Sequence, residues 1–64
     1  MTKPATERLT SFYQLVIAER PTFEKRAETM QGAIALMRET GQTSVNDAIM
    51  IAAKREAIRK GATL

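Results

Sequence analysis

The sequence has no cysteine, no histidine and no tryptophan among its 64 residues. Without cysteine the chain can form no disulfide and perform no thiol chemistry, and zinc sites built from Cys and His ligands are excluded. The missing histidine removes the commonest general base. We therefore expect no metal, no cofactor and no small-molecule substrate.

Long apolar runs are missing as well. The longest, Ala48 to Ala53, has six residues. A signal peptide needs roughly 7–15 apolar residues and a membrane span about 20. We therefore expect a soluble cytoplasmic protein that does not contact a membrane.

The composition that remains, 44% hydrophobic and 27% charged, is typical of a folded chain. We expect one small helical domain over residues 1–64, with 1–4 and 62–64 frayed. A domain of this size buries only about 60% of the surface that its unfolded chain exposes. Small domains gain stability from disulfides, metals or a partner subunit, and only the partner is open here. We therefore expect a homodimer.

The spacing of apolar residues predicts an all-α fold of three helices, at about 5–19, 21–40 and 44–60. The first helix carries apolar residues at the spacing of one helical face: Leu9, Phe12, Tyr13, Val16 and Ile17. Of the adjacent aromatics, one is expected in the core and the other at its rim. Pro21 is predicted to end this helix and to begin the next, since the residue before a proline disfavours the α conformation.

The second predicted helix carries a heptad-like seam, with spacings of four and three residues. The seam consists of Phe23, Ala27, Met30, Ile34 and Met37. We interpret it as the candidate dimer interface, with the first helix as the alternative surface. Gly32 lies within this helix and indicates either a close approach of a neighbouring backbone or a kink.

The third predicted helix begins with a capping residue, Ser44, and ends near Gly61. Its expected buried stripe consists of Val45, Ala48, Ile49 and Ala52, and the pattern weakens after Ala53. Gly41 is expected to end the second helix. The short connection between the two helices predicts an αα-hairpin.

The net charge of +3 gathers at the end of the third helix. The cations there are Lys54, Arg55, Arg59 and Lys60, beside the single anion Glu56. A basic helix end predicts contact with the phosphates of a nucleic acid, and these four residues are the candidate contacts. The cations equally suit the negative end of the helix dipole, with Glu56 pairing with Lys60 at i+4. Both interpretations stay open.

Catalytic residues are not indicated. The two serines, Ser11 and Ser44, have no histidine to activate them, and Ser44 is explained as a cap. Glu24 and Glu28 lie one turn apart and are interpreted as a solvated helix face. We expect a protein that is not an enzyme.

Residues 38–49, Arg-Glu-Thr-Gly-Gln-Thr-Ser-Val-Asn-Asp-Ala-Ile, resemble the turn between the two helices of ribbon-helix-helix repressors. That resemblance implies a strand before the first helix, here at residues 22–26, that enters the major groove in the dimer. Together with residues 19–29, the segment also resembles small accessory proteins of lambdoid phages, encoded between the recombination exonuclease and the excisionase. This second resemblance implies a non-enzymatic protein that adjusts host physiology or phage development.

Two functional hypotheses follow. The first is a small regulatory or interaction protein of phage or plasmid type, acting in the host cytoplasm by binding a host protein. The alternative is a DNA-binding transcriptional regulator, of ribbon-helix-helix or helix-turn-helix type, that contacts phosphates through the basic end of the third helix.

Overall fold

The computed structural model describes residues 5–61, with side-chain surroundings from Ser11 onward. These residues form three helices and no strand: α1 (Ala5–Arg26), α2 (Met30–Thr40) and α3 (Val45–Arg59). The expected all-α class is confirmed for this part of the chain. The predicted frayed ends, 1–4 and 62–64, lie outside the described residues.

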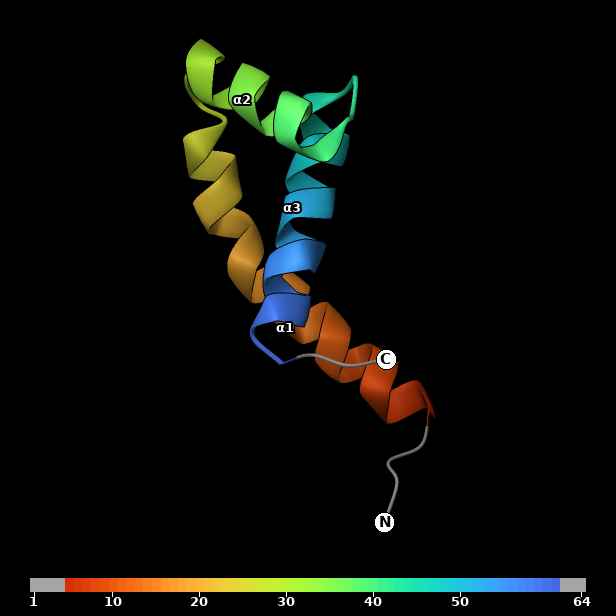
Figure 1. Ribbon diagram of the computed structural model, residues 1–64. Helices are drawn as coiled ribbons and strands as arrows, with labels where there is room; N and C mark the ends of the chain where they lie inside the picture. Colours follow the sequence, from red (N-terminus) through yellow and green to blue (C-terminus); the bar gives the residue numbers. More distant parts are fainter. Residues whose placement is uncertain (1–4, 62–64) are drawn as a thin grey trace.

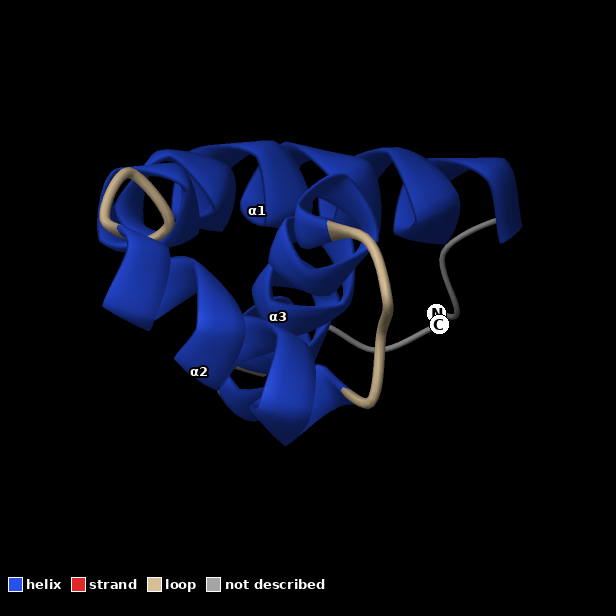
Figure 2. Ribbon diagram, turned by 90° about the horizontal axis from the view of Figure 1, so that it is seen from above, coloured by secondary structure: helices blue, strands red, loops and turns tan. Residues whose placement is uncertain are grey.

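The arrangement of the helices is set by α3, which packs across the middle of α1 (Figure 1). Helix α2 connects the far end of α1 to the start of α3 and contacts α3 across a short turn. Viewed along α3, the same arrangement shows α1 on one side and α2 on another (Figure 2). Each helix therefore keeps part of its surface away from the other two.

The core has two adjoining parts. The first joins α1 to α3 through Phe12, Val16, Ala53 and Ala57. The second joins α2 to α3 through Leu36, Ala48, Ile49 and Ala52. Phe23 lies against both parts. Alanines make up most of the residues that α3 contributes to the core, and their small side chains let the other helices approach closely.

The predicted boundary at Pro21 is wrong. Pro21 lies inside α1, which continues to Arg26 (Figure 1). A proline inside a helix costs about 3 kcal/mol, because it removes one hydrogen bond and its ring clashes with the preceding turn. Here Val16 before the proline and Phe23 after it both pack on the core, so tertiary packing holds the two halves in one helix.

The actual break comes at residues 27–29, so the predicted helix 21–40 is also wrong. Thr29 caps α2, and its hydroxyl oxygen accepts a hydrogen bond from the Gly32 N–H at 3.0 Å. A Cβ on Gly32 would lie 1.9 Å from the carbonyl oxygen of Arg26. Of the two roles expected for Gly32, the close backbone approach is therefore the correct one.

Residues 22–26, where the ribbon-helix-helix resemblance would require a strand, are helical.

The expected ends of α2 and α3 are confirmed. Gly41 adopts a left-handed conformation at φ 71° directly after α2. The Ser44 hydroxyl accepts a hydrogen bond from the Asp47 N–H in the first turn of α3. Both features are local, so the sequence alone is sufficient to predict them.

The predicted core positions are confirmed in part. Phe12 is buried and Tyr13 is 59% exposed, as expected of one core and one rim aromatic. Val45 is exposed rather than buried. The buried stripe of α3 does not end at Ala53, because Ala57 is completely buried beneath α1.

Candidate functional site

Helix α2 has a buried side and, opposite it, a side that exposes apolar residues. Leu36 and Thr40 face the core, and the Thr40 hydroxyl donates a hydrogen bond to the Leu36 carbonyl at 2.8 Å. Met30 and Ile34 face away from it and are 80% and 42% exposed. Met37 follows at the same helical spacing and is half-buried against the core. We call Met30, Ile34 and Met37 the α2 stripe.

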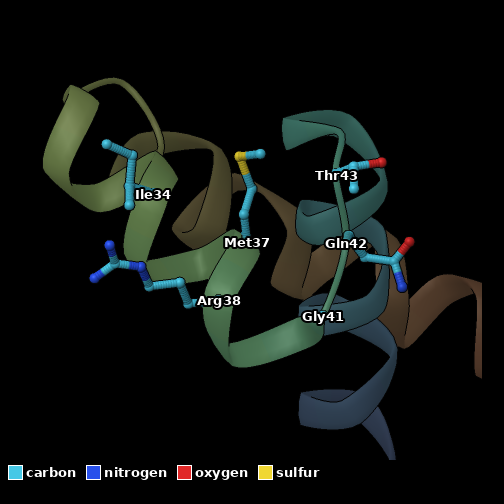
Figure 3. Close-up of a pocket in the computed structure, with 6 residues that line it drawn as sticks. All are labelled: Ile34, Met37, Arg38, Gly41, Gln42 and Thr43. Carbon is cyan, nitrogen blue, oxygen red and sulfur yellow. The ribbon is translucent and has the colours of Figure 1, made fainter.

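An open hollow of about 360 Å³ lies at the C-terminal end of the α2 stripe. Its walls come from α2 and from the turn that follows: Ile34, Met37, Arg38, Gly41, Gln42 and Thr43. The Met37 side chain rises between Ile34 and Thr43, while Gln42 points away from it (Figure 3). Arg38 supplies the only charge among these residues. The hollow is therefore suited to an apolar side chain with an acidic neighbour.

The candidate dimer interface is divided between different parts of the fold. Phe23 belongs to α1 and Ala27 to the turn, and both are half-buried against the core around Leu36. Met30, Ile34 and Met37 stay together on α2. The seam therefore does not lie on one helix, and its outward-facing part is the α2 stripe.

A second apolar pair lies on α1. Tyr13 and Ile17 are one helical turn apart, and they are 59% and 64% exposed. The Tyr13 ring meets the buried Phe12 ring edge-on, with centroids 6.5 Å apart. We call Tyr13 and Ile17 the α1 face. Apolar spacing alone groups Tyr13 and Ile17 with the buried Phe12 and Val16. The five apolar residues that the spacing groups together cover a wider face of the helix than α3 can bury.

Three of the four candidate nucleic-acid contacts are engaged within the chain. Arg55 donates a hydrogen bond to the Glu39 carbonyl at 3.1 Å, at the C-terminal end of α2. Arg59 pairs with Glu56. Lys60 pairs with Glu19 of α1 at 2.6 Å, so its predicted pairing with Glu56 is wrong. Lys54 is half-buried and makes no hydrogen bond or ion pair with the side chains described.

The charges at this end of α3 are balanced locally. Arg55 and Arg59 line a hollow of about 200 Å³ together with the carboxylates of Glu39 and Glu56. The hydrogen bond from Arg59 lowers the pKa of the Glu56 carboxyl below its ordinary value of 4.5. The same contact raises the pKa of Arg59. Both groups therefore stay charged at neutral pH, and the two carboxylates reduce the attraction of this hollow for a phosphate.

The remaining acidic candidates do not form a site. Glu24 pairs with Arg20 along α1, with its Oε1 atom 2.9 Å from Arg20 Nε. Glu28 lies in the turn before α2 and makes no such contact with any side chain described. Among the side chains that the structure describes, no group of three acidic residues is arranged to hold a metal ion. No helix within residues 5–61 is long and apolar enough to cross a membrane.

No protein-family model, no curated protein and no solved structure matches this chain.

Proposed function

We propose that this chain is a small regulatory protein of phage or plasmid type that acts, without catalysis, by binding a host protein. The observation that carries the proposal is the pairing of exposed apolar residues on two helices. Tyr13 and Ile17 on α1, and Met30 and Ile34 on α2, are all more than 40% exposed. Groups of exposed apolar residues typically mark interaction surfaces.

The α1 face is the proposed contact with the host protein. Tyrosine is frequent among the residues that dominate binding energy, because its ring adds much contact area and its hydroxyl can bond at the rim. Tyr13 is supported from behind by Phe12, which is fixed in the core. A side chain held in this way loses little conformational freedom on binding.

We further propose that the protein works as a homodimer, built on a helical hairpin of α2 and α3. A dimer would present the α1 face twice and thereby raise its apparent affinity for an oligomeric host protein. The two surfaces are on different helices, so each can be altered without changing the other.

Site-specific photo-crosslinking in bacterial cells tests the host-protein proposal. A photoreactive phenylalanine analogue is placed at Tyr13 or, as the control, at Thr22. Thr22 is also exposed on α1 but lies on a different face of the helix. We expect the Tyr13 position to yield one defined crosslinked protein, and the additional change Ile17→Glu to abolish it. Equal crosslinking from both positions, or none from Tyr13, would overturn the assignment of the α1 face.

The alternative function is a DNA-binding regulator that uses Lys54, Arg55, Arg59 and Lys60. The gathering of four cations at one helix end supports it, but the contacts of Arg55, Arg59 and Lys60 within the chain favour the first proposal. Binding to random duplex DNA, followed from about 50 to 200 mM salt, separates the two, because each phosphate contact adds a slope near −0.9 in log affinity against log salt. Tight binding with a steep slope, lost in Lys54→Ala/Arg55→Ala, would favour the regulator.

A further inference from the structure

The two ends of the α2 stripe complement each other in shape. Met30, at the N-terminal end, is 80% exposed and stands free of the core. The hollow beside Ile34 and Met37 lies at the C-terminal end. A methionine side chain is flexible and fits shallow, irregular apolar sites. One end of the stripe therefore offers a projecting side chain, and the other end offers a place for it.

The charges at the two ends complement each other as well. Glu28 lies two residues before the start of α2, and Arg38 lies in the last turn of α2 at the rim of the hollow. Neither makes an ion pair or a hydrogen bond with another side chain in the described part of the chain. The neighbouring charges are engaged, since Glu39 pairs with Arg26 at 2.6 Å. An anion and a cation, neither paired with a described side chain, thus mark opposite ends of one apolar stripe.

From this arrangement we infer that the α2 stripe binds the α2 stripe of a second copy of this chain, with the two helices antiparallel. A two-fold axis near Ala33 and Ile34 sets Met30 of each copy opposite Met37 of the other. The same register brings Arg38 beside Thr29 and Glu28 of the other copy. A two-fold interface requires a surface that complements itself, and both the shape and the charge of the stripe do so. Antiparallel helices also oppose their dipoles favourably.

The low burial of α2 gives a physical reason for this pairing. Leu36 is the only large apolar side chain that α2 buries completely. A helix of eleven residues is marginal in water without tertiary contacts. A second copy would cover Met30 and Ile34 and thereby stabilise the helix. The inference rests on the proposed self-association and is independent of the proposed host protein.

Disulfide trapping tests the register, because the chain has no cysteine of its own. Full-length Ile34→Cys, Met30→Cys, Met37→Cys and Ile17→Cys proteins are oxidised with a mild thiol oxidant and followed on non-reducing gels. We expect Ile34→Cys to form covalent dimers rapidly, since its Cβ atoms meet near the axis. An equal mixture of Met30→Cys and Met37→Cys should crosslink at least about tenfold faster than either protein alone. Ile17→Cys, exposed on α1, is the matched control and should stay slow.

Other outcomes of the trapping overturn the inference. Fast crosslinking of Met30→Cys alone and of Met37→Cys alone would indicate a parallel pair. Equal rates for Ile34→Cys and Ile17→Cys would indicate random collision rather than a defined interface.

Charge reversal tests the same register without cysteine and with two exposed residues. Arg38→Glu should raise the dimer dissociation constant by about tenfold, because it sets a second carboxylate against Glu28 of the other copy. The double change Glu28→Arg/Arg38→Glu should restore the wild-type value. A double variant no tighter than the single one would overturn the proposed contact. Neither change touches the α1 face, so loss of the host crosslink and loss of the dimer remain separate results.

Discussion

The contact between α1 and α3 differs from the surroundings of α2 in how completely the apolar side chains are buried. Where α1 crosses α3, Phe12 and Val16 lie against Ala53 and Ala57, and all four are buried. Helix α2 buries Leu36 and the polar Thr40, and leaves Met30 and Ile34 in solvent. In the first region large side chains pack on small ones and all are buried, whereas α2 packs on α3 along one side and leaves its other side exposed.

This difference indicates different tasks for the two regions. Burial of apolar surface is the main source of folding free energy, so the α1–α3 crossing supplies much of the stability. The largest exposed side chains of α2, Met30 and Ile34, contribute little to this burial. The attachment of α2 to the rest of the molecule depends on few residues, which makes α2 the part where single substitutions reveal most.

Leu36→Ala should have the largest effect on stability. Leu36 is 0% exposed, and removing it leaves a cavity between α2 and α3. We expect the free energy of unfolding to fall by about 2–5 kcal/mol. This is a large share of the roughly 3–10 kcal/mol of unfolding free energy typical of a chain this size. Urea unfolding followed by circular dichroism, at protein concentrations below dimerisation, measures it. The matched control is Ile34→Ala on the outer face, which should cost less than about 1 kcal/mol; similar losses for both would mean that α2 has no inner and outer face.

Gly32→Ala should destabilise the junction between α1 and α2, where the turn at residues 27–29 joins the two helices. The added Cβ would meet the Arg26 carbonyl oxygen, so the first turn of α2 must move away from the end of α1. The expected loss is about 1–3 kcal/mol, although alanine favours a helix over glycine. Gln31→Ala, at the exposed neighbouring position, is the control and should leave the urea midpoint nearly unchanged. A stabilised Gly32→Ala protein would contradict the close approach of the two helices.

Thr40→Val should lower the free energy of unfolding by less than Leu36→Ala or Gly32→Ala. Valine keeps the shape of the buried side chain but removes the hydroxyl that donates to the Leu36 carbonyl. The Leu36 carbonyl belongs to the hydrogen-bonded backbone of a helix and does not depend on this hydroxyl alone. We therefore expect the free energy of unfolding to fall by about 0.5–1.5 kcal/mol. Thr43→Val, in the exposed turn, should be close to neutral. The difference between the two threonines gives the contribution of the buried hydroxyl to holding α2.

Glu56→Gln should have the smallest effect, and only in acid. The pKa of Glu56 is lowered in the folded chain by the hydrogen bond from Arg59, so its contribution is complete above the ordinary value of 4.5. That contribution is lost as the pH falls through the lowered pKa. We expect Glu56→Gln to weaken the dependence of the unfolding midpoint on pH below about 5, and Arg59→Met to do the same. An unchanged pH profile in both variants would contradict the pairing.

Local features of this fold were predictable from the sequence, and contacts between distant residues were not. Gly41 and Ser44 end and begin helices through bonds to residues three or four positions away. The boundary predicted at Pro21 is wrong because the rule for proline is local, while Phe23 is held by packing against the core.

The candidate surfaces show the same division. The spacing of Met30, Ile34 and Met37 places them on one face, but only the fold decides that this face points outward. Burial of Ala57 depends on how closely α1 crosses α3, and apolar periodicity assigns little weight to an alanine. The pair between Lys60 and Glu19 joins residues 41 positions apart, beyond the reach of helical spacing.

Sedimentation equilibrium of three proteins tests most directly whether α2 is the surface that another copy covers. Wild type, Ile34→Glu and Ile17→Glu are compared at the same concentrations, with circular dichroism as the check on folding. We expect a dimer for wild type, a folded monomer for Ile34→Glu and an unchanged dimer for Ile17→Glu. A wild-type protein that stays monomeric up to about 100 μM, or a dimer that Ile17→Glu dissociates and Ile34→Glu does not, would contradict the assignment of α2.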